Sequence, residues 1–225
     1  MRLNRTFVIG VLAFLAFVFV MEYRMPKKFR WTPTFSHRDK QPFGCYVFDS
    51  MLKASIPQGY QVVRKTFYQL KEDTTTKAVL MVADEVRLSK TDVAAILEMA
   101  GGGSHILVAS ERLGLLADTL HIADNYHYTS MSITEYARSG QNRDTLVWQQ
   151  DSIYTGHTFT VYPQLLQRTI SGPTDSLGYQ VLCRAKKYAH APVALHIPLG
   201  KGSITWASTP LLFTNYGILD HDNYL

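Results

Sequence analysis

Acidic and hydroxyl side chains follow two apolar segments of the sequence, at the points where those segments end. Asp84 and Glu85 follow the first segment, and Ser110 and Glu111 follow the second. In an open α/β sheet, ligands bind beyond the carboxyl ends of parallel strands. If the two segments are neighbouring parallel strands, Asp84, Glu85, Ser110 and Glu111 form one ligand-binding edge, and this is our prediction.

The second of these places could also carry nucleophilic chemistry. A serine or carboxylate on a sharp strand-to-helix turn can attack a substrate when a histidine, here His196 or His221, activates it. Such a turn needs small neighbours, but the local sequence VASERLG contains neither cysteine nor the pattern G-x-S-x-G. The simpler interpretation is that Ser110 and Glu111 cap the helix that follows. A divergent hydrolase that uses Ser110 or Glu111 is the alternative.

Two other patterns have the residue types of a ligand site. His121 and His127 flank Asp124 in the segment HIADNYHY, and three such side chains could bind a metal ion. Their spacing is also that of alternating side chains on a β-ribbon, which is the interpretation we favour. The segment GKG at 200–202 lacks the phosphate-loop pattern G-x-x-x-x-G-K-[ST] and predicts a hairpin turn. We predict no metal and no cofactor.

The basic character of the chain belongs to its first 40 residues. The net charge is +5, but residues 1–40 hold eight of the 23 basic residues and only two of the 18 acidic ones. The rest of the chain is therefore close to neutral, which disfavours a nucleic-acid-binding protein. Cys45 and Cys183 are the only cysteines and lie in no metal or redox spacing, so we interpret both as packing residues.

The two apolar segments belong to a strand–helix–strand pattern. The runs at 78–83 and 106–109 predict strands that are buried on both faces. Between them, Ser89 is placed to cap a helix, apolar residues recur at the helical spacing, and three glycines at 101–103 end it. This is the unit from which parallel α/β sheets are built, with a right-handed crossover.

Shorter patterns predict the other elements. Helices are expected at 43–52 (against the sheet edge), 66–70 and 113–120, and a strand is expected at 61–64. Residues 121–175 lose the α/β rhythm and predict a β-rich insertion with strands at 121–130, 144–149 and 158–162. Later strands are expected at 179–184, 193–197 and 203–207. A new helix is expected after Asp220, and the missing stop signal at Leu225 favours a fragment.

The N-terminal segment predicts a membrane anchor. Residues 6–21 are apolar and uncharged, and no small-x-small cleavage site follows them. We therefore expect an anchor at 1–24, an extended connector at 25–42 and a folded domain at 43–225. Basic residues flank both ends of the apolar run, but its similarity to a signal peptide favours a cytoplasmic N-terminus and an extracytoplasmic domain.

Three features together resemble a known family: the short N-terminal anchor, the segment WTPTFSHRDKQPFGCYVFD at 31–49 and the segment GKGSITWASTPLLFTNYGIL at 200–219. They are similar to bacterial membrane-anchored proteins of the domain of unknown function 4350 family. The resemblance implies a fold like that of class I glutamine amidotransferases, a flavodoxin-like, mostly parallel sheet with helices on both faces. It also implies a second membrane helix after the domain, and a role near a MoxR-type AAA+ ATPase.

The amidotransferase activity does not transfer with this resemblance. The strand-to-helix turn at Ser110 and Glu111, where these enzymes carry their nucleophile, holds no cysteine. The stretch ASTPLL at 207–212 supplies neither the histidine nor the glutamate that would activate a thiol. We therefore expect a non-catalytic domain at the cytoplasmic membrane that binds a protein or a ligand. A carbohydrate-binding module is a further alternative, because the chain is rich in tyrosine around 126–162.

Overall fold

The structure is a computed structural model that describes residues 5–24, 29–56, 59–73, 75–127, 143–149, 157–162, 166, 168–171 and 178–225. The chain divides into two compact units, Met1–Arg30 and Trp31–Leu225. The second unit begins before residue 43, where the sequence placed the start of the domain.

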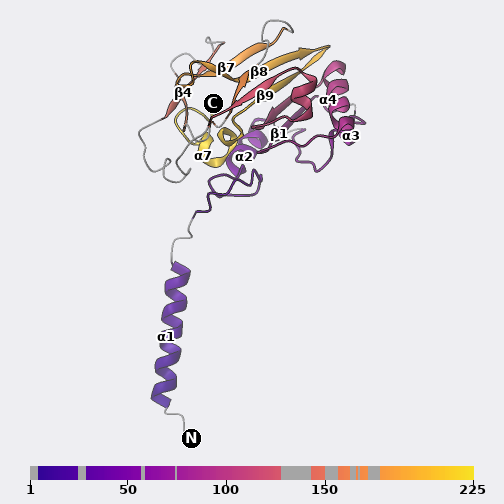
Figure 1. The fold of residues 1–225 in the computed structure, drawn as a ribbon. Coiled ribbons are helices and arrows are strands. Elements are labelled where there is room, and N and C mark those ends of the chain that lie inside the picture. Colours follow the sequence, from indigo (N-terminus) through magenta and orange to yellow (C-terminus); the bar gives the residue numbers. More distant parts are fainter. Residues whose placement is uncertain are drawn as a thin grey trace. The chain divides into compact units, whose positions relative to one another are not determined.

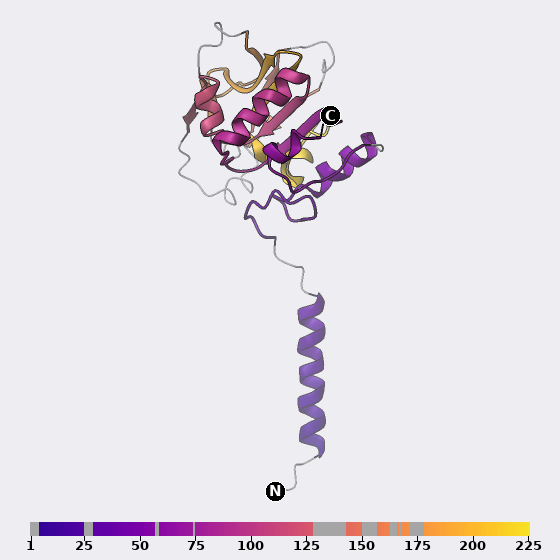
Figure 2. The ribbon, with the colours of Figure 1, turned by 90° about the vertical axis from the view of Figure 1, so that its right-hand side faces the viewer.

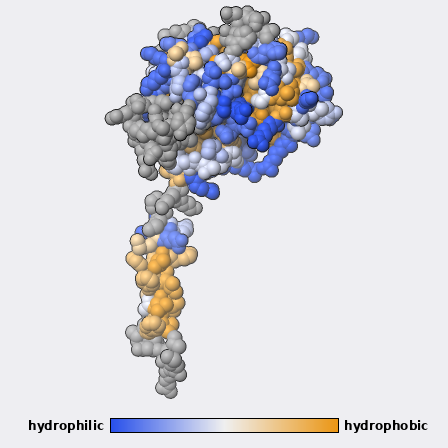
Figure 3. Space-filling view, viewed as in Figure 1, coloured by the Kyte–Doolittle hydropathy of each residue, from blue (hydrophilic) through white to orange (hydrophobic). Residues whose placement is uncertain are grey.

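The first unit contains one long helix, α1, which spans Arg5–Arg24. Its window Phe7–Arg24 has a mean hydropathy of 2.0, and none of that window is buried inside the protein. Figure 3 shows apolar residues along the helix. A helix of this length extends about 30 Å, the thickness of a bilayer core. By length and composition, α1 could therefore cross a membrane.

The second unit is built on a seven-stranded mixed sheet in the order β1-β2-β9-β8-β7-β4-β5 (Figure 1). The strands span Ala78–Val82 (β1), His105–Ala109 (β2), Asp144–Trp148 (β4), Phe159–Val161 (β5), Gln180–Ala185 (β7), Ala191–Leu199 (β8) and Gly202–Ala207 (β9). β1, β2 and β9 pair in parallel, and every pairing from β9 to β5 is antiparallel.

The predicted strand–helix–strand unit is present. Helix α4 spans Lys90–Gly102 between β1 and β2, and its N-cap Ser89 accepts a hydrogen bond from the backbone N–H of Asp92. Gly103 ends the helix in the left-handed conformation, with φ of +116°. A side chain at this φ would be strained, so glycine suits the turn into β2.

The antiparallel half of the sheet corrects the prediction of a mostly parallel sheet. Gly200 and Lys201 connect β8 to β9, and a connection this short can only join antiparallel strands. Gly202 must be small, because a Cβ there would lie 2.1 Å from the carbonyl oxygen of Ser104. The predicted strands within 121–175 do not form one separate insertion, since β4 and β5 extend the main sheet.

A second sheet has two antiparallel strands, β3 at Ala123–Tyr126 and β6 at Arg168–Ser171. The sequence predicted β3 but not β6. The remaining part of the predicted strand at 128–130 lies outside the described residues.

Both faces of the main sheet are covered. On one face, Ile106 and Val108 of β2 join a core that contains residues of α3 (Phe67–Leu70), α4 and α5 (Leu115–Thr119). On the other, Ala109 joins a core with Phe43 and Leu211. Figure 2 shows α4 lying against the sheet. β9 and most of β2 are thus buried, as a strand with neighbours on both sides should be. The prediction that the run at 78–83 is buried on both faces is wrong: β1 is the edge strand, none of its residues is fully buried, and Leu80 is 38% exposed, because only β2 pairs with it.

Three predicted elements differ in the structure. Residues 61–66 form no strand and are exposed, because no neighbouring strand pairs with them. Helix α2, Tyr46–Ser55, packs on the C-terminal elements and not on the sheet edge: the rings of Phe48 and Phe213 lie 5.3 Å apart. The last helix, α7, spans Asn215–Ile218, and the chain after Asp220 forms turns.

The segment before residue 43 is part of the second unit. The Asn215 side-chain amide donates to the carbonyl oxygens of Asp39 and Gln41, at 2.9 and 2.7 Å. The ring of Trp31 packs edge-on against Phe43. Residues 31–42 are therefore held by contacts from the end of the chain, which a reading of the segment alone could not predict.

Candidate functional site

The residues after β1 and β2 lie side by side, as the sequence predicted for neighbouring parallel strands. The backbone N–H of Glu111 donates to the carbonyl oxygen of Asp84 at 3.0 Å, and a parallel bridge pairs Glu85 with Arg112. Glu85 also forms ion pairs with Arg87 and Arg112, at 3.2 and 3.7 Å. The predicted residues therefore share one edge of the sheet.

Ser110 is a structural residue at this edge. Its side chain is fully buried, and its hydroxyl lies 3.0 Å from the Asp84 carbonyl oxygen and 2.8 Å from that of Arg112. Trp206 donates its indole N–H to the Ser110 carbonyl oxygen at 2.8 Å. A buried hydroxyl that donates to backbone carbonyls holds two loops together and is a poor nucleophile.

Neither of the two histidines considered for a triad hydrogen-bonds to Ser110. His196 contacts Thr205 at 3.2 Å, and His221 contacts Thr160 at 3.3 Å. The predicted helix cap is also wrong, because α5 begins at Leu115 and its N-cap is Gly114. Ser110 instead connects the two loops that follow β1 and β2, where backbone hydrogen bonds between the two segments continue.

Glu111 is the residue at this edge with unusual electrostatics. Its pKa is raised to about 7, first by burial and then by the negative charge of Asp84, while the positive charge of Arg168 opposes the rise. No hydrogen bond to its carboxylate occurs among the residues that the structure describes. A half-buried carboxylate with a pKa near neutrality can bind a cationic or hydrogen-bonding group, or transfer a proton.

The small sheet supplies the other groups near Glu111. Arg168 of β6 forms an ion pair with Asp124 of β3, and its guanidinium lies 5.0 Å from the ring centre of Tyr126. The Nε atom of Arg168 is buried and has no hydrogen-bond partner. Tyr126 is 55% exposed, so an aromatic face is available to a ligand. We call Asp84, Glu85, Glu111, Asp124, Tyr126 and Arg168 the Glu111 edge.

Sequence reasoning missed Arg168, because the segment RTIS carries no strand pattern. It also considered Asp124 as a metal ligand with His121 and His127, but that carboxylate pairs with Arg168. His127 instead contacts Thr169 at 2.8 Å, and burial lowers its pKa. In the described part of the chain, no three His, Cys, Asp or Glu side chains are grouped so that they could hold a metal ion.

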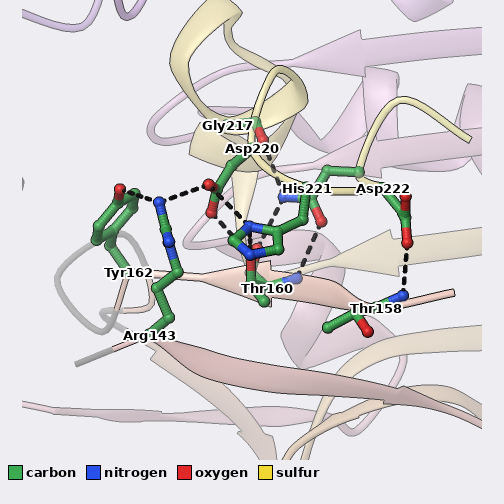
Figure 4. Close-up of polar contacts among 9 residues, drawn as sticks. Arg143, Thr158, Thr160, Tyr162, Gly217, Asp220, His221 and Asp222 are labelled. Atoms are coloured by element: carbon green, nitrogen blue, oxygen red, sulfur yellow. Dashed lines mark hydrogen bonds and ion pairs between the residues drawn. The ribbon is translucent and has the colours of Figure 1, made fainter. Parts of the chain in front are cut away.

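A second polar cluster lies at β5, the strand at the opposite end of the sheet order from β1. Figure 4 shows its side chains. Asp220 forms an ion pair with Arg143 at 2.8 Å and accepts a hydrogen bond from the Thr160 hydroxyl at 2.7 Å. Arg143 also donates to the Tyr162 hydroxyl at 2.7 Å. Asp220, His221 and Asp222 therefore dock on the residues of β5 and on Thr158 before it.

Side chains from the C-terminal turns cover the edge of β5. Asn223 accepts a hydrogen bond from the Thr160 backbone N–H at 3.0 Å and donates to the Thr160 carbonyl oxygen at 2.7 Å. Asp222 accepts from the Thr158 N–H at 2.7 Å. These bonds replace those of a neighbouring strand, so the edge is protected from pairing with another chain. We call Arg143, Thr160, Tyr162, Asp220, Asp222 and Asn223 the Asp220 cluster.

The two cysteines are buried and unbonded, as packing residues are. Burial raises the pKa of Cys45 and that of Cys183 to about 12. Neither thiol is therefore activated as a nucleophile.

Comparison with known proteins identifies a family and a fold. A family model described as "Domain of unknown function (DUF4350)" matches residues 37–224. Among curated proteins, none matches this chain. The solved N-terminal domain of mmIFT52 aligns with a TM-score of 0.53 at 13% identity, over 79% of this chain and 85% of that domain. At this identity the likeness concerns the fold alone.

Two glycoside hydrolases align less well. The β-galactosidase from Bacillus circulans sp. alkalophilus aligns at 12% identity over 64% of this chain, with a TM-score of 0.41. The exo-β-1,4-mannosidase Op5Man5 from Opitutaceae bacterium strain TAV5 aligns at 11% identity over 89% of this chain, with a TM-score of 0.46. The chain spans 22% of the first enzyme and 35% of the second. These likenesses carry no statement about activity.

Proposed function

This chain belongs to the domain of unknown function 4350 family, and on that premise we propose that it is a membrane-anchored binding domain without catalytic activity. Helix α1 is the proposed anchor in the cytoplasmic membrane, crossing it once, with the second unit on the extracytoplasmic side. The Glu111 edge is the proposed binding site for a partner protein or a ligand. Nucleic acid is not among the proposed partners, because residues 41–225 are nearly neutral.

One observation carries the choice of site. Glu111 is half-buried, has a pKa raised to about 7 and receives no hydrogen bond from the described residues, while Arg168 beside it has an unpartnered Nε. Buried polar groups normally have partners, so a binding partner that supplies them would gain free energy. We propose that the bound group carries a cation or N–H donor for Glu111.

The proposed partner is a membrane protein in a complex with a MoxR-type AAA+ ATPase. The support is the association that the family resemblance implies. An ATPase acts on the cytoplasmic side, so an extracytoplasmic domain would reach it only through a protein that spans the membrane. Binding at the Glu111 edge would then connect this domain to that spanning protein.

The fold supports a finer proposal about ancestry. We propose that β1, α4, β2 and β9 are the amidotransferase-like, flavodoxin-like part of the domain, and that the antiparallel strands replaced the rest. Parallel pairing of these three strands and the crossover helix support this. The absence of the cysteine and histidine of amidotransferases from the matching positions agrees with a binding role.

The test is extraction of the tagged full-length protein in detergent, followed by crosslinking and identification of co-purified proteins. We expect a stoichiometric membrane protein with the wild type and with Glu98→Gln, a control at an exposed ion pair with Lys71. Glu111→Gln and Arg168→Met should each reduce its recovery about tenfold. Equal recovery with all variants would place binding elsewhere.

A hydrolase that uses Glu111 as a general acid or base is the second candidate function. The pKa of about 7 is the observation that favours it, because a proton-transfer group works best when its pKa is near the working pH. The assay is hydrolysis of glutamine and of a nitrophenyl ester by the purified protein. Activity that is lost in Glu111→Gln but kept in Glu98→Gln would establish this function over the first.

A carbohydrate-binding module is a third candidate, and the exposed ring of Tyr126 favours it. Glycan-array binding that Tyr126→Ala abolishes would support it. No binding to any glycan would remove it.

A further inference from the structure

A basic groove lies on the second unit and shares no lining residue with the Glu111 edge or the Asp220 cluster. It is an open hollow of about 420 Å³ lined by His37, Arg38, Lys53, Val62 and Arg64. Its walls come from three places in the sequence: the segment before α2, the last turn of α2, and the exposed segment 59–66. The convergence of distant cations on one hollow is a tertiary feature that no local pattern shows.

The positive charge of the basic groove is not neutralised. Lys53 forms an ion pair with Asp49 at 2.6 Å, and Asp49 also accepts a hydrogen bond from Tyr60 at 2.8 Å. Burial alone would raise the pKa of Asp49, but these partners lower it, so the carboxylate is ionised. Arg38 and Arg64 have no acidic partner within ion-pair distance among the described residues. The groove therefore keeps an excess of about two positive charges.

Apolar side chains stand in water beside these cations. Val62 is 48% exposed and Val63 is 40% exposed, directly before Arg64. Ile56, just after α2, is 49% exposed. Exposed apolar side chains next to arginine and lysine are the composition of surfaces that contact the interface of a membrane with anionic lipids.

We propose that the basic groove docks on the anionic surface of the membrane, with one lipid phosphate between Arg38, Lys53 and Arg64 and the two valines in the interface. This inference rests on the proposed anchoring by α1. Between Arg24 and Arg38 the chain spans at most about 50 Å, so the groove stays close to the bilayer at high effective concentration. Guanidinium groups bind phosphate oxygens through two parallel hydrogen bonds, and both arginines line the same hollow.

The size of the effect follows from the charges. Each cation near an anionic membrane surface favours the docked state by roughly fivefold. Replacing Arg38 and Arg64 with glutamate reverses two charges and should abolish docking. Because the attraction is screened by salt, 0.5 M NaCl should weaken it strongly.

The experiment uses the full-length protein inserted in nanodiscs, with hydrogen exchange as the readout. One set contains phosphatidylcholine alone, and the other contains about one third phosphatidylglycerol, to supply the surface charge. Amides at 61–65 are exposed and lie in no helix or strand, so they should exchange rapidly when undocked. We expect at least about fivefold slower exchange there in the anionic nanodiscs. The doubly substituted Arg38→Glu/Arg64→Glu variant should lose this protection.

A matched control distinguishes the effect of the groove residues from the effect of the change in net charge. Lys186→Glu/Lys187→Glu makes the same change of charge at two exposed residues in the turn after β7, and should keep the protection. Equal protection in neutral nanodiscs, or protection that survives Arg38→Glu/Arg64→Glu, would overturn the proposal. Protection by glycerol 1-phosphate in neutral nanodiscs would assign the groove to a soluble phosphate compound instead of the membrane.

The two proposals fail in different ways. If the protein inserts in nanodiscs and residues 61–65 show no dependence on lipid charge, the groove proposal fails and the anchor stands. If the protein does not remain with the nanodiscs at all, the anchor proposal fails, and the groove proposal fails with it.

Discussion

The Glu111 edge and the Asp220 cluster are both polar assemblies of charged residues from distant parts of the chain, yet their hydrogen bonding differs. Asp220 has an ion pair with Arg143 and a hydroxyl donor from Thr160, and Asn223 pairs with the backbone of β5. Glu111 has neighbouring charges and no donor among the described residues. The satisfied cluster holds the end of the chain on the sheet, whereas the unsatisfied edge has capacity left for a partner. We propose the Glu111 edge as a binding site because its groups lack hydrogen-bond partners, and not because it contains more charges.

The largest effect should come from breaking the Asp220 cluster. Asp220→Ala removes the acidic partner of Arg143 and the acceptor for the Thr160 hydroxyl, and the Asp220 side chain is only 10% exposed. We expect a loss of about 2 to 3 kcal/mol in the free energy of unfolding. Urea denaturation of residues 31–225, which contain both hydrophobic cores, measures it. Asp222→Ala, at a more exposed carboxylate, should cost under about 1 kcal/mol. Equal losses of unfolding free energy in the two variants would mean that Asp220 contributes no more to stability than Asp222.

Ser110→Ala should show that a structural residue stands directly beside the Glu111 edge. The substitution removes the hydroxyl that joins the Asp84 and Arg112 carbonyl groups, and we expect a loss of about 1 to 2 kcal/mol. Recovery of the co-purified partner, measured in parallel, should not change. If the wild type hydrolyses glutamine or the nitrophenyl ester, and Ser110→Ala loses this activity with unchanged stability, Ser110 would instead be a nucleophile.

Glu111→Gln should change the pH dependence of stability. The pKa of Glu111 is about 7 in the folded protein against 4.5 as the ordinary value, so the folded state holds this proton more tightly. Stability from this group is complete below about pH 4.5 and is lost as the pH rises through about 7. Because solvent screens the half-buried group, we expect about 1 kcal/mol.

The measurement is urea denaturation of the wild type and Glu111→Gln at several pH values from 4 to 8. The wild type should lose stability relative to the variant over that range. Parallel pH curves would mean that Glu111 is solvated like an ordinary surface carboxylate, and the comparison of the two clusters would lose its basis.

Tyr126→Ala should have the smallest effect on stability, under about 0.5 kcal/mol, because the ring is 55% exposed. If the Glu111 edge binds a partner, the same substitution should reduce recovery of that partner severalfold, since exposed tyrosines contribute strongly to interfaces. A large loss of stability without any change in binding would make Tyr126 a structural residue of the small sheet.

The sequence predicted the elements whose signals are local. Ser89, Asp92 and Gly103 mark the two ends of α4 within a few residues of it, and the apolar runs on either side identify β1 and β2. Once these strands are parallel neighbours, their ends must meet, so the proximity of Asp84 to Glu111 followed from the pattern alone. The family resemblance also came from continuous segments of the sequence, at 31–49 and 200–219. The family is confirmed by a match over residues 37–224.

Only the tertiary structure decided which groups surround Glu111. Arg168 reaches this edge because β6 pairs with β3 in a register that places it opposite Tyr126, and a four-residue polar strand carries no periodic signal. In the same way, Thr160 and Asp220 meet across 60 residues of chain. The periodicity of apolar residues and the helix caps involve residues that are near neighbours in the sequence. Polar contacts between distant segments depend instead on the strand order and on which surfaces are buried. The sequence alone determined the strand–helix–strand unit and the apolar N-terminal helix; folding determined the Glu111 edge and the basic groove, because their residues meet only when distant segments pack together.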